Sequence, residues 1–452
     1  MNQVTPRLKV VIAILSLLLT FFVWQRGLEE SFDRPSVAPT LIINQREIAL
    51  LAEPALPEPF KKVLVGSSPE TALIETLSEI PLKEMGPRQK LLLASFEDSV
   101  DQRVNLLQDS ISEPNLKLVK NLLLKNFSDE DNLQLNLKKL KQARLDPLLY
   151  QRSCLFIGVN KDLCIDKSVS NAMAFRLAGS QFMPSFAVLM GIGLILRQSW
   201  RFIRKANTPW PDVSSIPLSL IDMVLLIAGG FVLLGEVISP LFSLSFIDSF
   251  AYGLSAPIKE SLKVFAGYIG MTVPPLFIYR RQINNIKDAI QPIGGWAQWH
   301  FLPIKKAFAD AVQGWLIITP FVLLTSLVMN LFVGDPGGSN PLLEMVLMSK
   351  NFWALGIIFF TTAVVAPLFE EFVFRGVLLP VLVDKQGRFL GVILSAFIFA
   401  LAHLSVGELL PLFVLGIGLA FLRLSSGRLF PCIIMHSLWN GVTFVSLLLL
   451  SA

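Results

Sequence analysis

Residues 352–383 read FWALGIIFFTTAVVAPLFEEFVFRGVLLPVLV, an apolar run long enough to cross a bilayer as a helix. The run carries Glu370, Glu371 and Arg375 close together in its second half. An ionisable side chain in hydrocarbon costs at least about 3 kcal/mol, so such residues within a membrane helix usually serve a function. This stretch therefore predicts both a membrane helix and a polar site inside it.

The composition of the whole chain is also typical of a membrane protein. The 452 residues are 53% hydrophobic and 16% charged, whereas soluble domains carry about a quarter charged residues. We therefore expect an all-α, polytopic membrane fold with about nine spans. The candidate segments are 10–24, 177–196, 216–244, 262–279, 311–333, 352–383, 389–404, 409–422 and 431–450.

Basic residues follow alternate spans, which predicts an orientation. They cluster at 197–205, 280–306, 385–388 and 423–428, and such clusters are retained on the cytoplasmic side. The N-terminus, with Arg7 and Lys9 before the first span, falls on that side too. Since topology explains the net charge of +5, we expect the lipid bilayer as a partner and no nucleic acid.

The pattern divides the chain into four parts: an anchor at 1–24, a domain at 25–179, membrane helices at 180–334 and a membrane core at 335–452 that contains the polar stretch quoted above. The anchor could be a cleaved signal, but no cleavage pattern follows Trp24. Residues 25–179 are rich in charge and in amphipathic helical patterns, which predicts a soluble helical domain. The topology puts this domain outside the cytoplasm, where we expect it to bind a partner or substrate.

Cys154 and Cys164 both fall in this outer domain. They are near enough to form a disulfide in an oxidising periplasm or lumen. Two buried thiols are the alternative.

Three polar motifs lie in the last apolar segments, and helical spacing relates their members. Glu371 and Arg375 can pair, which leaves Glu370 free for substrate or water. The others are Phe399 with His403, and His436 with Asn440.

The expected depths of these side chains in the membrane are similar enough for them to lie close together. If 384–388 is the membrane surface between two antiparallel helices, Glu370 and His403 each lie about 20 Å below it, and His436 lies about 12 Å deep. Carboxylates and imidazoles together suit proton transfer to water and stabilisation of an oxyanion, the two tasks of peptide hydrolysis.

The order Glu-Glu-x-x-x-Arg, Phe-x-x-x-His and His-x-x-x-Asn on successive helices resembles the CAAX-processing and bacteriocin-processing (CPBP, or Abi) family of intramembrane endopeptidases, which includes type II CAAX prenyl endopeptidases. The resemblance covers about 353–450. It implies that Glu370 activates the attacking water with help from His403. It also implies that His436 and Asn440 stabilise the oxyanion or hold the catalytic group, and that Glu371 and Arg375 support the site. The expected substrate is a membrane-associated peptide or protein.

Several alternatives stay open. Glu370, His403 and His436 could bind zinc, although no separate carboxylate would then remain as the base. The chain could instead be a non-proteolytic scaffold or a bacteriocin-immunity or maturation factor of the same family. A transporter is a third class, but no inverted repeat of spans supports it. Asp222 and Glu236, in the third span, either face the cavity or form packing ion pairs.

Overall fold

The computed structural model describes residues 6–125, 133–206, 209–286, 290–334 and 337–451. Throughout these ranges the regular structure is helical, which confirms the all-α fold. The chain forms two compact units. Unit 1 comprises Met1–Val37 and Pro184–Leu448, and unit 2 comprises Ala38–Met183 with Leu449–Ala452.

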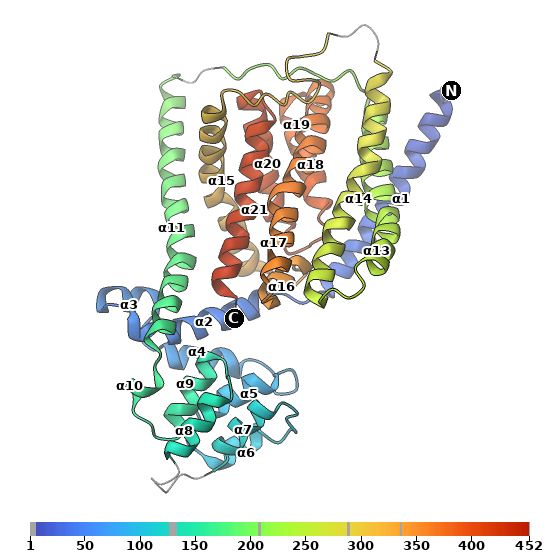
Figure 1. Ribbon diagram of the computed structural model, residues 1–452. Helices are drawn as coiled ribbons and strands as arrows, with labels where there is room; N and C mark the ends of the chain where they lie inside the picture. The colour runs from blue at the N-terminus through green and yellow to red at the C-terminus, as the bar shows by residue number, and fades with distance from the viewer. Residues whose placement is uncertain (1–5, 126–132, 207–208, 287–289, 335–336, 452) are drawn as a thin grey trace. The chain divides into compact units, whose positions relative to one another are not determined.

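Eight helices in the described residues are long and apolar enough to cross a membrane. Most of their length lies in unit 1, where they run side by side (Figure 1). They are α1 (Pro6–Phe32), α11 (Lys167–Ile203), α12–η3–α13 (Leu220–Phe250), α14 (Ala256–Asn284), α15 (Ile304–Val333), α17–α19 (Phe352–Leu401), α20 (Leu409–Ser426) and α21 (Phe430–Leu450).

The longest of these, Phe352–Leu401, is a hairpin of two arms. Its turn contains Gly387, whose φ of 82° is accessible to glycine at little cost. Beyond the turn the arms pack together, since Ser395 Oγ donates to the Phe374 carbonyl at 3.3 Å. The two arms correspond to the expected spans 352–383 and 389–404. Counted separately, they bring the eight helices to the nine expected spans.

The arm that carries the glutamate pair changes its winding twice. The α-helix α17 (Phe352–Phe360) widens into the π-helical η4 (Thr361–Val365), and α18 (Ala366–Glu371) widens into η5 (Phe372–Leu378). Pro367 has no N–H for the carbonyl four residues earlier, which explains why regular α-winding is lost before it. Wide turns of this kind occur often at functional sites.

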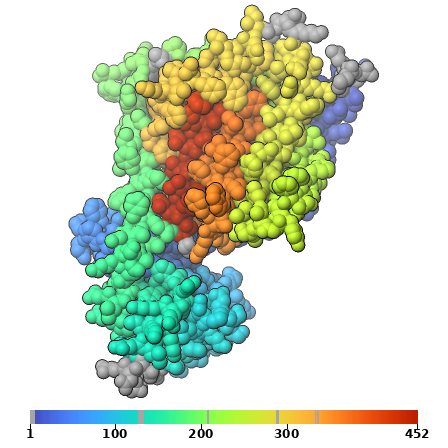
Figure 2. Space-filling model, in the orientation of Figure 1, coloured from blue at the N-terminus to red at the C-terminus, as the bar shows by residue number. Residues whose placement is uncertain are grey.

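Packing of aromatic and small side chains orders unit 1. The ring of Phe231 on the π-helical η3 (Leu225–Ile238) lies 5.9 Å from that of Phe369 and 5.8 Å from that of Phe374, so it joins η3 to the hairpin. A Cβ on Gly416 would lie 3.0 Å from Ala396 Cα, so α20 and α19 (Leu379–Leu401) approach closely. Lipid tails are as apolar as leucine, so such close packing stabilises helix contacts within a membrane. In Figure 2, α21 (red) lies beside the α17 arm (orange).

Unit 2 consists of short helices around its own apolar core. The core includes Leu91, Leu122 and Leu149. Arg88 ties it together, because its guanidinium lies 2.8 Å from both Glu47 and Asp146. The helices are α2 (Ala38–Ala52), η1 (Glu53–Ala55), α3 (Glu58–Leu64), α4 (Pro69–Ser78), α5 (Pro87–Ala94), α6 (Val100–Leu106), α7 (Pro114–Leu123), α8 (Leu133–Gln142), α9 (Pro147–Phe156) and α10 (Lys161–Cys164).

Helix α1 is longer than the apolar run that predicted it. It continues past Trp24 to Phe32, and Arg26 pairs with Glu30, four residues later, at 2.8 Å on its exposed face. Unit 2 begins at Ala38. Of the two alternatives for Cys154 and Cys164, the structure has the disulfide, which joins α9 to α10. Residues 126–132 of the expected outer domain and 335–336 of the expected core lie outside the described residues.

Candidate active site

Glu371 is the fully buried half of the glutamate pair. Its Oε1 accepts hydrogen bonds from Arg375 Nη1 and from His436 Nδ1, each at 2.9 Å. The Arg375 guanidinium is also fully buried, donates to the Gly416 carbonyl at 3.2 Å and lies over the Phe399 ring at 4.2 Å. Glu371 is thus engaged by a cation four residues away, as helical spacing suggested, and by a histidine from α21.

Glu370 has a different environment. Its Oε1 accepts a hydrogen bond from the Tyr268 hydroxyl on α14. Its Oε2 lies 3.9 Å from His403 Nε2 and 3.8 Å from His436 Nε2, and has no hydrogen-bond partner. One oxygen of the carboxylate is therefore held, and the other faces two imidazoles.

The hydrogen bonds of the two imidazoles define their tautomers. His403 Nδ1 lies 2.8 Å from the Phe399 carbonyl, and His436 Nδ1 lies 2.9 Å from Glu371 Oε1. Both partners accept only, so each Nδ1 carries a proton and donates it. In a neutral ring Nε2 is then an acceptor. Glu370 Oε2 and the two Nε2 atoms thus form a set of three acceptors, which a water molecule complements by donating its two hydrogens.

A zinc ion fits this arrangement poorly. Ligand atoms about 2.0–2.1 Å from a tetrahedral zinc ion lie about 3.3 Å from one another. The separations of 3.8 and 3.9 Å from Glu370 Oε2 to the two Nε2 atoms are wider. Across the described ranges, no three His, Cys, Asp or Glu side chains form a group that could hold a metal ion. We therefore derive no step through zinc.

Asn440 lies one turn after His436 on α21, but it contacts a different part of the hairpin. Its Nδ2 donates to the Thr362 carbonyl at 2.8 Å. That carbonyl belongs to η4, the wide turn just before the helix that carries Glu370. Asn440 therefore ties η4 to α21.

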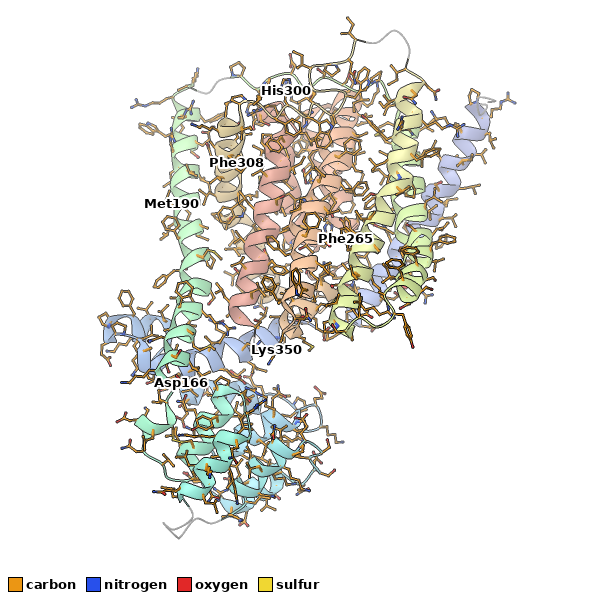
Figure 3. All side chains as sticks on the ribbon, viewed as in Figure 1. Asp166, Met190, Phe265, His300, Phe308 and Lys350 are labelled. Atoms are coloured by element: carbon orange, nitrogen blue, oxygen red, sulfur yellow. A yellow bond between two sulfur atoms is a disulfide. The ribbon has the colours of Figure 1, made fainter. Side chains whose placement is uncertain are left out.

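Tyr268 is a site residue that sequence reasoning missed. The chain has four tyrosines, and Tyr268 falls in the middle of a predicted span, where a phenol usually needs a polar partner. That signal could have selected the residue, but it could not name Glu370 as its partner. Phe265, which Figure 3 labels, precedes Tyr268 by one turn on α14, and its ring centroid lies 6.3 Å from that of Phe360.

The two acidic residues of the third span, Asp222 and Glu236, have different surroundings. Asp222 forms an ion pair with Lys9 of α1, as in the packing alternative. Glu236 on η3 interacts electrostatically with both Glu370 and Tyr268. A third carboxylate therefore lies beside the site.

Comparisons with known proteins relate two parts of the chain to known families. Residues 352–442 match the family described as type II CAAX prenyl endopeptidase Rce1-like, and residues 38–175 match a domain of unknown function, DUF8675. The membrane-embedded CAAX protease MroQ of Staphylococcus aureus (strain USA300) is 27% identical over 153 residues, which cover 32% of this chain and 61% of MroQ. The match thus spans less than two thirds of that relative. No solved structure matches the chain. The paired glutamates, the two histidines that face them and the match over residues 352–442 identify that region as a domain of the Rce1-like type II CAAX prenyl endopeptidase family.

Proposed function

We propose that this chain is an intramembrane endopeptidase that hydrolyses a peptide bond of a membrane-associated peptide or protein with water activated by Glu370. The observation that carries the proposal is the partnerless Glu370 Oε2, which lies within 4 Å of two histidine Nε2 atoms. The family match and the likeness to a relative named as a membrane-embedded CAAX protease support it.

The proposed reaction begins with a water molecule that donates hydrogen bonds to Glu370 Oε2 and to one Nε2. As the water oxygen attacks the carbonyl carbon, Glu370 takes the proton, and a tetrahedral oxyanion forms. Glu370 then passes this proton to the leaving nitrogen, and the C–N bond breaks. The carboxylate is regenerated, so atoms and charges balance over the cycle.

Exposure and pairing distinguish the roles of the four groups. Glu371 and His436 are buried and bonded to each other, so we assign them to holding the site. His403 is the more open histidine, with 22% of its side chain exposed, and we assign it contact with the attacking water, from which its Nε2 accepts a hydrogen bond. Asn440 holds the turn before Glu370 through Thr362. Tyr268 fixes Oε1 of Glu370, so that Oε2 is the oxygen that acts.

We also propose that the N-terminus is cytoplasmic and that unit 2 lies outside the cytoplasm. Basic residues lie at the C-terminal ends of α11 and α14, at the end of unit 1 where Figure 3 places His300, and such residues favour the cytoplasmic side. The Cys154–Cys164 disulfide suits an oxidising compartment.

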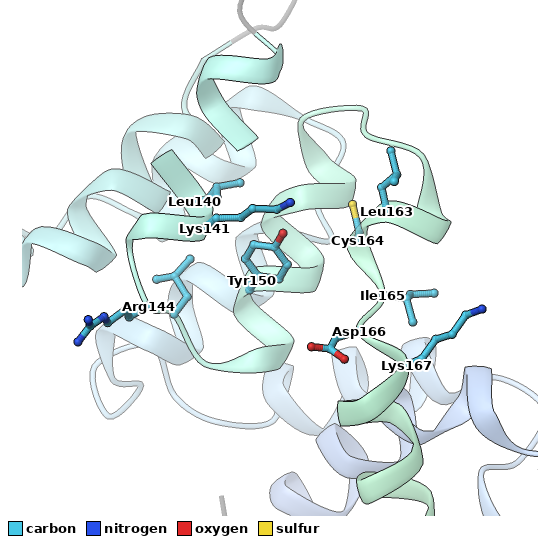
Figure 4. Close-up of a pocket in the computed structure, with 10 residues that line it drawn as sticks. Leu140, Lys141, Arg144, Tyr150, Leu163, Cys164, Ile165, Asp166 and Lys167 are labelled. Atoms are coloured by element: carbon cyan, nitrogen blue, oxygen red, sulfur yellow. The ribbon is translucent and has the colours of Figure 1, made fainter. Parts of the chain in front are cut away.

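Unit 2 is the proposed place where a partner or substrate is recruited. It has a hollow of about 500 Å³ between α8, α9 and the start of α11. Tyr150 lies within it, and Lys141 and Asp166 line it as well (Figure 4). This mixture of an aromatic ring and both charges suits a polar peptide segment.

A comparison of membrane proteins tests the proposal. The full chain and its Glu370→Gln variant are expressed in the same host, and membrane peptides are quantified by mass spectrometry. We expect an uncleaved membrane protein to accumulate with the variant. The matched control is Glu260→Gln, on an exposed acid of α14 that pairs with Lys263. Identical profiles for all three chains would contradict proteolysis and favour a scaffold or bacteriocin-immunity role.

A further inference from the structure

The backbone just after His403 adopts an uncommon conformation. Leu404 follows the C-terminal end of α19 (Leu379–Leu401) and has a φ of 47°. The left-handed region is unfavourable for a residue with a Cβ atom, so surrounding contacts must maintain it.

The end of α1 and the two residues after it, residues 27–34, contact both the side chain and the carbonyl of Leu404. Gly27 leaves room for the leucine side chain, since a Cβ there would lie 2.8 Å from Leu404 Cδ1. The Arg34 guanidinium donates a hydrogen bond to the Leu404 carbonyl. The side chain and the carbonyl of the strained residue are thus both held by residues 27–34.

The next two residues are fastened in the same way. Val406 N donates to Ser31 Oγ at 3.0 Å, and Ser405 Oγ donates to the Gly338 carbonyl at 2.6 Å. Gly338 N in turn donates to the Arg34 carbonyl at 2.9 Å. Ser31 and Ser405 are both buried, so these are paired polar groups inside the fold and not surface contacts.

Charge reinforces the arrangement. Glu408 accepts a hydrogen bond from Asn340 N at 3.3 Å and interacts electrostatically with both His403 and Arg34. Burial raises the pKa of the Glu408 carboxyl, and the neighbouring Arg34 guanidinium opposes that rise. Arg34 therefore contributes to the charge balance beside His403 as well as to the backbone contact.

We propose that Gly27, Ser31 and Arg34, here called the α1 clamp, position His403 for the reaction by holding Leu404 in its left-handed conformation. The catalytic part of this inference rests on the proposed function. The clamp lies outside the region 352–442 that matches the endopeptidase family. The site would thus depend on the N-terminal helix α1 and the residues that directly follow it.

Chemical labelling tests the clamp without any substrate. Arg34→Met keeps the apolar stem and removes the guanidinium. The purified full chain in detergent is treated with diethylpyrocarbonate, and labelling of each histidine is followed by mass spectrometry. The chain has three histidines, so His300 and His436 serve as internal references for His403.

We expect Arg34→Met to accelerate labelling of His403 about tenfold, the factor that corresponds to about 1.4 kcal/mol, with both references unchanged. Arg34→Lys should restore much of the protection. The matched control Arg26→Met removes an exposed cation of α1 and should leave all rates unaltered. Ser31→Ala is a second, smaller test in the same direction. Unaltered His403 labelling in both clamp variants would overturn the inference, as would an equal rise at all three histidines.

Activity gives a second readout once a substrate is captured with Glu370→Gln. Arg34→Met should lower kcat with little change in KM, because His403 acts on the reacting water, and Arg34→Lys should recover part of it. The two proposals can fail separately. If Arg34→Met changes the labelling but the wild-type chain has no peptidase activity, only the proposed function is contradicted. If Arg34→Met has full activity and unaltered labelling, only the clamp is contradicted.

Discussion

Removing the Arg375 guanidinium should strongly destabilise unit 1. Arg375→Met keeps the apolar stem but deletes a 2.9 Å ion pair with Glu371 and a 3.2 Å hydrogen bond to the Gly416 carbonyl. Both charged side chains are 0% exposed, so water cannot replace the lost partner. Breaking a buried pair in this way costs about 3–5 kcal/mol, or about 10²–10⁴ in the folding equilibrium.

The measurement is unfolding of the full chain in mixed micelles with increasing SDS, followed by tryptophan fluorescence. The double variant Glu371→Gln, Arg375→Met removes both charges and should be more stable than Arg375→Met alone by about 1–3 kcal/mol. Arg388→Met, at an exposed arginine, is the matched control and should change stability by about 0.5 kcal/mol or less. If Arg375→Met were as stable as this control, or the double variant were the least stable, the buried pair would not have the role assigned here.

Three further predictions concern the site and unit 2. Tyr268→Phe deletes the hydrogen bond to the acting glutamate and should lower turnover of a captured substrate about tenfold. Tyr279→Phe, on the same helix, should not, and equal activities would contradict the assignment. Cys164→Ser opens the disulfide loop and should destabilise unit 2 by about 3 kcal/mol, seen as faster limited proteolysis; unchanged cleavage would refute this. A zinc chelator should leave turnover unaltered, and its loss with recovery on adding zinc would contradict the metal-free reaction.

Much of the candidate site could be predicted because it depends on local geometry. The Glu371–Arg375 pair follows from a spacing of four residues on one helix. The approach of Glu370 and His403 follows from matched depths on the two arms of a hairpin, and the sequence indicates its turn at 384–388 through charge and glycine. These inferences need only the helical rise and the position of a surface.

The contacts that were missed join helices far apart in the chain. Tyr268 and Glu370 are 102 residues apart, and a membrane helix that is apolar on every side does not reveal which face meets which neighbour. The same limit applies to Arg34 and Leu404. The link from Asn440 to Thr362 depends on the π-helical η4, whose altered phase simple α-periodicity cannot anticipate.

The central claim is that Glu370 activates water to cleave a peptide bond. The most direct measurement reconstitutes the purified wild-type chain, or Glu370→Gln, in liposomes with the captured membrane protein in ¹⁸O-enriched water. We predict that the wild type produces a shorter product whose new carboxyl group carries ¹⁸O, and that Glu370→Gln produces none. Equal cleavage by the two chains, or an intact substrate with the wild type, would contradict the account.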